Sequence, residues 1–204
     1  MKKILLSFCG LALLAGCATT SPRLNQLTSA EKQAGWVLLF DGASLAGWTP
    51  REAALWEVVD GAIAYRPGTG PGHLCTTKSY GDFELQVDFW VDNVANSGVF
   101  LRCPASGHIA ATNSYEVNIY DPHLKWPTGS IVEIALRQGG IHSVGHWNHY
   151  DLVAQGDHLV VRFDDRVVVD IHDAKYRSGS IGLQQFTGQG MIKFRNIKLK
   201  PLPQ

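Results

Sequence analysis

One nine-residue stretch constrains the fold of this chain more than any other feature. From Phe83 to Val91, apolar residues at every second position alternate strictly with Glu84, Gln86, Asp88 and Trp90. Successive side chains of a β-strand point to opposite sides of a sheet, so this pattern predicts a strand with one buried face. A helix would need a repeat near 3.6 residues, which is absent here. The chain must therefore contain a sheet that buries one of its sides.

Shorter strand candidates follow at steady spacing, with 21 Gly and 9 Pro between them. Asp60-Gly61 and Asp164-Asp165 have the residues of two-residue hairpin turns. Many short strands separated by turns favour an all-β jelly-roll sandwich over alternating strands and helices. The further strands are expected at residues 36–40, 56–59, 62–65, 98–102, 115–120, 130–136, 149–154, 158–164, 166–171, 180–184 and 191–198.

A single helix is expected, and it lies near the N-terminus. Thr28-Ser29-Ala30-Glu31 matches a capping box, in which the threonine and the glutamate each bond the other's backbone N–H. Gly35 follows at a distance that suits a helix stop. These signals predict about two turns of helix before the strands begin.

The first residues indicate export. Lys2 and Lys3 precede an apolar run over residues 4–15, which ends in Leu14-Ala15-Gly16-Cys17. A basic head, an apolar core and small residues before a cysteine are typical of a lipoprotein signal, with Cys17 as the lipidated residue. The run is shorter than the roughly 20 residues that a membrane span needs. The alternative is an ordinary secretory signal cut near Ala18.

These boundaries divide the chain into three parts. We expect a signal peptide over residues 1–16, a small and polar lipidated tether over residues 17–27, and one domain over residues 28–204. Ala18 offers no acidic residue to retain a lipoprotein in the inner membrane, so we expect an anchor in the outer membrane of the cell envelope.

Charge and cysteine content narrow the partners. The formal net charge is zero and no basic stripe appears, which argues against a nucleic-acid partner. The predicted domain contains Cys75 and Cys103. After export they are able to form a disulfide, or they remain buried as free thiols; the sequence leaves both open.

Strand alternation also predicts a polar face. If Val99 and Leu101 are buried, Phe100 and Arg102 point to the other side; the same argument turns outward Glu116, Asn118 and Tyr120. If these strands lie beside strand 83–91, Trp90 joins the same band. Carboxylate, amide, guanidinium and aromatic groups on a concave sheet suit a sugar. The alternative is an ordinary solvated sheet face.

Several segments also resemble a known family. They are Gly35-Trp36-Val37-Leu38-Leu39-Phe40-Asp41-Gly42 with Gly47-Trp48, Tyr80-Gly81-Asp82-Phe83-Glu84-Leu85, Asn96-Ser97-Gly98-Val99-Phe100-Leu101-Arg102, Tyr115-Glu116-Val117-Asn118-Ile119, Trp147-Asn148-His149-Tyr150, Gly182-Leu183-Gln184 and Phe194-Arg195-Asn196-Ile197. Their order and types resemble the 3-keto-disaccharide hydrolase domain family. The resemblance implies a concanavalin-like jelly roll and hydrolysis of glycosides that carry a ketone at C3.

A C3 ketone sets chemical requirements. It acidifies the C2–H, and loss of that proton gives an enolate that expels the group on C1. We expect Glu116 to be the base, with Arg102 at the enolate oxygen and His123 as a further catalytic candidate. The alternative for Arg102 and Glu116 is an ion pair that only orders adjacent strands. We expect the substrate to be bound by Asn96, Asn118, Gln184, Tyr120, Trp90 and Trp126.

Further partners follow from this chemistry. Nothing in the sequence handles a redox cofactor, so a separate sugar 3-dehydrogenase would supply the substrate. Asp121, Asp164, Asp165 and Asp170 are candidate ligands for Ca²⁺ or another divalent metal, although no loop shows a full ligand set. The competing function is a non-catalytic, lectin-like carbohydrate-binding module, because one fold serves many functions.

Overall fold

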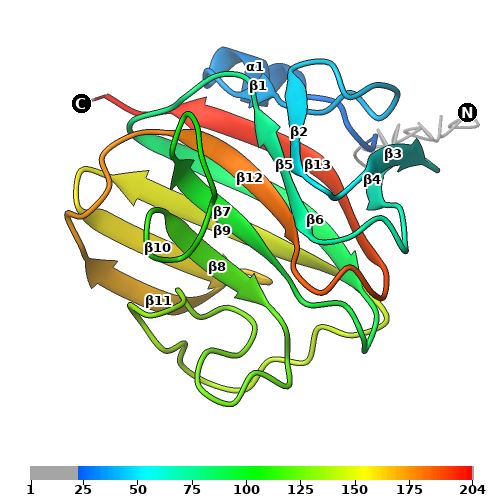
Figure 1. The fold of residues 1–204 in the computed structure, drawn as a ribbon. Helices are drawn as coiled ribbons and strands as arrows, with labels where there is room; N and C mark the ends of the chain where they lie inside the picture. The colour runs from blue at the N-terminus through cyan, green and yellow to red at the C-terminus, as the bar shows by residue number, and fades with distance from the viewer. Residues whose placement is uncertain (1–22, 204) are drawn as a thin grey trace, which may run out of the picture.

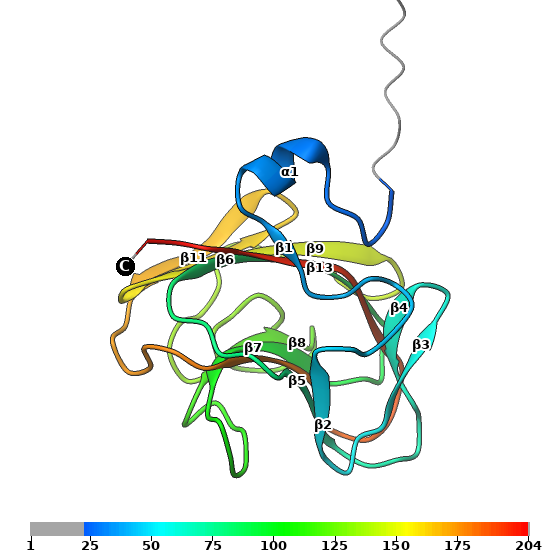
Figure 2. The same cartoon turned by 90° about the horizontal axis from the view of Figure 1, so that it is seen from above.

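A computed structural model describes residues 23–203. The predicted signal peptide, Cys17 and the first part of the tether lie outside these residues. Two antiparallel sheets face each other and enclose the core, as Figures 1 and 2 show. The all-β jelly-roll prediction is confirmed. None of the helical segments in the described part of the chain has the length and apolar character to cross a membrane.

The larger sheet has eight strands and contains the long alternating segment. Its spatial order is β11 (Arg166–His172), β10 (His158–Phe163), β9 (Trp147–Gln155), β6 (Phe83–Val91), β13 (Ile192–Pro201), β4 (Ala62–Tyr65) and β3 (Trp56–Val59), while β1 (Val37–Leu38) also pairs with β13. The smaller sheet has five strands, in the order β2 (Trp48–Glu52), β5 (Gly72–Thr76), β12 (Ser180–Gln185), β7 (Ser97–Cys103) and β8 (Tyr115–Ile119).

The core lies between the sheets. On β6, Phe83, Leu85, Val87 and Phe89 are fully buried, while the residues between them are half-buried on the outer side. Side chains from β7, β8 and β12 close the core from the smaller sheet. Burial of this apolar surface supplies the main favourable term for folding.

Helix α1 (Ser29–Gln33) forms as the capping box predicts, but with only five residues. The Glu31 N–H donates to Thr28 Oγ1 at 3.2 Å, and the Thr28 N–H donates to Glu31 Oε2 at 2.7 Å. Gly35, at φ +86°, ends the helix with a backbone conformation that other residues rarely adopt. Figure 2 shows α1 on the outer side of the larger sheet, where Glu31 pairs with Lys198 of β13.

Both predicted hairpin turns are present. Asp60 and Gly61 join β3 to β4 with φ values of 51° and 72°, and Asp164 and Asp165 join β10 to β11 at 45° and 66°. Positive φ at both central residues gives the turn a twist that matches paired strands. The local sequence therefore specified these connections correctly.

One predicted strand is absent and two strands were missed. Residues 130–136 form turns instead of a strand: Ile131 and Ala135 bond each other's backbone, and Glu133 between them has φ +62°. Strands β2 and β5 were not predicted. Strand β2 contains Pro50, which is tolerated because β2 lies at the edge of its sheet. Strand β5 is buried along its whole length and so shows no alternation.

Candidate functional site

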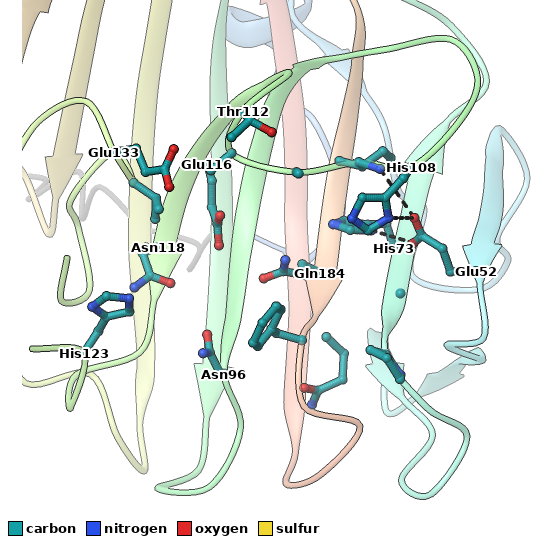
Figure 3. A pocket seen from close by; sticks show the side chains of 18 residues that line it. Glu52, His73, Asn96, His108, Thr112, Glu116, Asn118, His123, Glu133 and Gln184 are labelled. Atoms are coloured by element: carbon teal, nitrogen blue, oxygen red, sulfur yellow. Dashed lines mark hydrogen bonds and ion pairs between the residues drawn. The ribbon is translucent and has the colours of Figure 1, made fainter. Parts of the chain in front are cut away.

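A cavity of about 600 Å³ opens on the outer face of the smaller sheet, the face turned away from the core. Residues of β5, β12 and β8 form its floor with Asn96, which precedes β7, and loops after β7 and β8 form its walls. Figure 3 shows Glu116, Asn118 and His123 on one side and Glu52, His73 and His108 on the other, with Gln184 between them. The volume falls within the usual range of small-ligand pockets, roughly 300–1,000 Å³.

Strand register explains which side chains meet in the cavity. Glu116 of β8 pairs with Phe100 of β7, Asn118 pairs with Gly98, and Gln184 of β12 pairs with His73 of β5. Residues that pair directly across an antiparallel sheet project to the same face. The neighbouring Val99 and Val117 are buried in the core, so the parity argument places Glu116 and Asn118 correctly.

Glu116 has an environment that suits a base at neutral pH. Burial in the cavity wall, together with the nearby negative charge of Glu133, raises the pKa of Glu116 to about 7. No hydrogen bond or ion pair joins its carboxyl to another side chain in residues 23–203. A carboxylate that is poorly solvated and unpaired accepts a proton readily.

His123 presents a hydrogen-bond donor to the cavity. Its Nδ1 accepts the backbone N–H groups of Trp126 at 2.9 Å and Lys125 at 3.2 Å. An imidazole nitrogen that accepts cannot carry a proton, so in the neutral ring the proton is on Nε2. His123 lines the cavity, and the loop backbone fixes its tautomer.

The predicted amides also line the cavity. Asn118 is held in place, since its side-chain Nδ2 donates to the Trp126 carbonyl and its backbone carbonyl accepts from the Tyr150 hydroxyl at 2.7 Å. Asn96 lines the edge of the cavity. Gln184 is 5% exposed, and its Oε1 accepts no hydrogen bond from the part of the chain that the structure describes.

Arg102 does not reach the cavity, and the prediction that placed it there is wrong. Strand β7 has a bulge, because Cys103 pairs with Ser180 while Phe100 pairs with Gly182. Arg102 lies in this bulge with φ +58°, which turns its side chain away from the face that holds Glu116. Its guanidinium donates to the carbonyls of Gly81, Gly156 and Tyr176 and to Asp82 Oδ1, at 2.8–3.0 Å.

Three predicted aromatic residues also lie outside the cavity lining. Trp90 is on β6, which belongs to the larger sheet, so it faces the opposite side of the molecule with Lys193 5.8 Å from its ring centre. Trp126 packs under Lys125 and contributes its backbone carbonyl to Asn118. Tyr120 follows β8 without reaching the lining. The prediction that Trp90 shares one polar face with Glu116 and Asn118 is therefore wrong.

The cavity lining also includes Glu52, His73, His108 and Phe186, which were not predicted as site residues. Glu52 Oε2 lies 2.7 Å from His73 Nδ1, and Glu52 Oε1 lies 3.3 Å from His108 Nδ1. Phe186 stands at the rim with 60% of its surface exposed. Phe186 comes two residues after Gln184, a spacing that would have predicted both side chains on the same face. Nothing marked His73, because its strand lacks alternation.

The Glu52–His73 pair is polarised. Burial opposes ionisation of Glu52, but the hydrogen bond from His73 and its charge hold the pKa of Glu52 below its ordinary value. Burial also lowers the pKa of His73, more than Glu52 raises it. Near neutral pH the pair is therefore an ionised glutamate beside a neutral imidazole.

Cys75 and Cys103 lie beside the cavity floor, on either side of Gly182 in β12. Both are buried, and neither forms a disulfide within residues 23–203. In residues 23–203, no group of three or more His, Cys, Asp or Glu side chains is arranged to hold a metal ion. Of the aspartates considered for Ca²⁺, Asp121 accepts from the Ser143 N–H and hydroxyl. The divalent metal stays a prediction.

Comparison with solved structures shows the same fold elsewhere. A Parabacteroides distasonis ATCC 8503 protein, provisionally named a glycosyl hydrolase, superposes with a TM-score of 0.78 at 19% identity, over 89% of this chain and all of the other. The carbohydrate-binding module CBM66 from Bacillus subtilis superposes with a TM-score of 0.60 at 23% identity, over 76% of this chain and 95% of the module.

Sequence comparison gives a relative and a family. The levanase of Bacillus subtilis (strain 168) is 24% identical over 160 residues, which are 76% of this chain. The chain spans only 23% of that enzyme's length. Residues 35–200 match the 3-keto-alpha-glucoside-1,2-lyase-like domain, in the order of motifs noted above. The chain therefore belongs to the 3-keto-disaccharide hydrolase family, whose domain is described as 3-keto-alpha-glucoside-1,2-lyase-like.

Proposed function

We propose that this protein cleaves 3-keto-glycosides, with Glu116 as the general base. The observation that carries the proposal is a cavity-lining carboxyl with a pKa of about 7 and no partner among the described residues. A base works best when its pKa lies near the working pH. Family membership supports the choice of substrate class, and the cavity contains a group that such a substrate would require.

The proposed reaction begins with proton removal. Glu116 takes the C2 proton, and the electrons of the C2–H bond form an enolate with the C3 oxygen. The enolate then reforms the ketone while the bond between C1 and the leaving oxygen breaks, and that oxygen takes a proton from the Glu116 acid or from water. Addition of water across C1 and C2 gives the free 3-keto sugar.

Other cavity residues fit the remaining tasks. His123 offers its Nε2 proton, so we propose that it donates to the C3 oxygen as negative charge develops there. This replaces the role expected of Arg102. Asn96, Asn118 and Gln184 would bind hydroxyls. Phe186 would pack its exposed ring against the C–H surface of the sugar, the task expected of Trp90 and Trp126.

The proposed location follows from the N-terminal sequence. We propose an exported lipoprotein, anchored through Cys17 in the cell envelope, that acts on sugars oxidised at C3 by a separate dehydrogenase. Because the fold is shared with a carbohydrate-binding module, a lectin-like role is the competing function.

An activity assay on a panel of 3-keto-disaccharides tests the proposal. Wild-type protein should release the free sugar, and deuterium at C2 should slow release if proton removal limits the rate. Binding of these sugars without any release would contradict the enzymatic proposal and favour the binding module. Glu116→Gln serves as the matched variant, because it keeps the size of the side chain and removes the base.

A further inference from the structure

Two buried acceptor atoms on adjacent strands of the cavity floor lack hydrogen-bond donors. They are His73 Nε2 on β5 and Gln184 Oε1 on β12, and neither has a partner within residues 23–203. The two residues are direct partners in the sheet register, so both side chains project to the cavity face. His73 is 3% exposed and Gln184 is 5% exposed, so water does not satisfy these atoms. Buried polar atoms of this kind usually have partners.

Glu52 makes His73 Nε2 an acceptor. The carboxylate lies 2.7 Å from Nδ1, and an ionised carboxylate only accepts, so the ring proton of neutral His73 is on Nδ1. Nε2 then presents a lone pair. The ring also packs edge-on against Phe100, with ring centres 4.8 Å apart, which fixes its orientation.

His108 contacts the same glutamate from the loop that follows β7, with its Nδ1 3.3 Å from Glu52 Oε1. Its side chain is 76% exposed, and Figure 3 shows it beside His73 on the same wall of the cavity. Binding to the buried acceptors requires a movement in this wall, and an exposed side chain on a loop moves easily.

We propose that His73 Nε2 and Gln184 Oε1 accept hydrogen bonds from two hydroxyl groups of one sugar residue, and thereby select for ligands that carry both. The subsite lies opposite Glu116 in the cavity and therefore binds a part of the sugar away from C2. It rests on the proposed sugar ligand, but it does not depend on the chemistry at C3. Glu52 is a positioning residue in this subsite.

Fluorine substitution tests the pairing, because a C–F group cannot donate a hydrogen bond. The probes are one 3-keto-disaccharide and its analogues with a single hydroxyl replaced by fluorine. Binding is measured calorimetrically in a Glu116→Gln background, which prevents turnover. One analogue should bind roughly 10- to 100-fold more weakly than the parent, the usual effect of leaving one buried acceptor without a donor.

The variants His73→Phe and Gln184→Leu identify which acceptor is involved. His73→Phe should weaken binding of the parent sugar by a similar factor, and one fluoro analogue should then bind as well as the parent. Gln184→Leu should have the same effect with a different analogue. His146→Phe, the same substitution at an exposed histidine outside the cavity lining, is the control. Equal penalties for each analogue in all variants would overturn the proposal, as would a failure of every probe to bind.

A measurement on a chain with native His73 guards against variants that do not fold. The ¹⁵N resonance of His73 Nε2 should move toward that of a hydrogen-bonded nitrogen when the parent sugar saturates the protein; an unchanged resonance would overturn the proposal. Selective binding without turnover contradicts the proposed function alone. Turnover without hydroxyl selectivity contradicts the subsite alone.

Discussion

The Glu116 side chain lies against the backbone of Gly98, its diagonal neighbour on the adjacent strand β7. A Cβ atom added to Gly98 would come within 3.2 Å of Glu116 Cγ and 3.3 Å of Glu116 Oε1. The backbone of Gly98 has an ordinary strand conformation, which any residue can adopt. A glycine is therefore needed here because there is no room for a side chain. The missing side chain leaves room for the proposed base.

Gly98→Ala should therefore displace the Glu116 carboxyl with little effect on the fold. We expect turnover of a 3-keto-glycoside to fall about tenfold or more, since small misplacement of a reacting group is costly. Gly140→Ala is the matched control, because a Cβ there meets nothing within 4 Å. Equal turnover of the two variants would show that the space beside Gly98 does not determine the position of the Glu116 carboxyl.

The pH dependence of turnover should follow Glu116. The base must be ionised, so kcat/KM should rise with pH and level off above a pKa of about 7. Glu116→Gln should lower turnover by roughly 10²–10⁴-fold and remove this rise. A wild-type profile that is flat between pH 5 and 9 would argue against Glu116 as the base.

The same carboxyl should make stability depend on pH. Its folded-state pKa of about 7 lies above the ordinary glutamate pKa of 4.5, so the folded state holds the proton more tightly. The free energy of unfolding should therefore fall as pH rises from about 4.5 to 7 and change little beyond. Glu116→Gln should be more stable than wild type at pH 8, on the order of 1–3 kcal/mol, and similar at pH 4. Urea unfolding at both values measures this.

Arg102 should affect stability instead of chemistry. Its buried guanidinium joins the carbonyls of three separate segments and Asp82, so Arg102→Met removes the donors of those three carbonyls and leaves Asp82 Oδ1 with only the Gly156 N–H. We expect a loss of about 3–5 kcal/mol, the range seen when a buried charged partner is removed. Arg102→Lys should recover only part of it, because an ammonium group cannot reproduce the planar set of donors. Unchanged stability with lost turnover would restore the original catalytic assignment.

Cys17 provides the test of anchoring. Cys17→Ser removes the thiol that would be acylated, so the protein should move from the membrane fraction to the soluble fraction of the envelope. Ala18→Ser, which keeps the thiol, is the neighbouring control. Membrane association that survives Cys17→Ser would contradict the lipoprotein prediction.

The sequence predicted those parts of the site that depend on local periodicity. Glu116 and Asn118 are on the expected face because β8 is a regular strand. Arg102 is not, because a single bulge in β7 reverses the alternation and no residue type announces it. The prediction for Trp90 was wrong for a different reason. Alternation shows that a strand has two faces, but it does not show to which sheet the strand belongs. His73 was hidden because β5 is buried on both sides.

The N-terminal segment and the cavity mouth lie on opposite sides of the protein. The first described residues run along the outer side of the larger sheet, where Asn25 and Asn196 bond each other's backbone and α1 packs nearby (Figure 2). The cavity opens from the other sheet. An acyl group on Cys17, six residues before Arg23, would hold the larger sheet within about 20 Å of the bilayer. If Cys17 is lipidated as proposed, a mouth on the side away from the anchor should take up freely diffusing oligosaccharides more readily than glycolipids of the same leaflet.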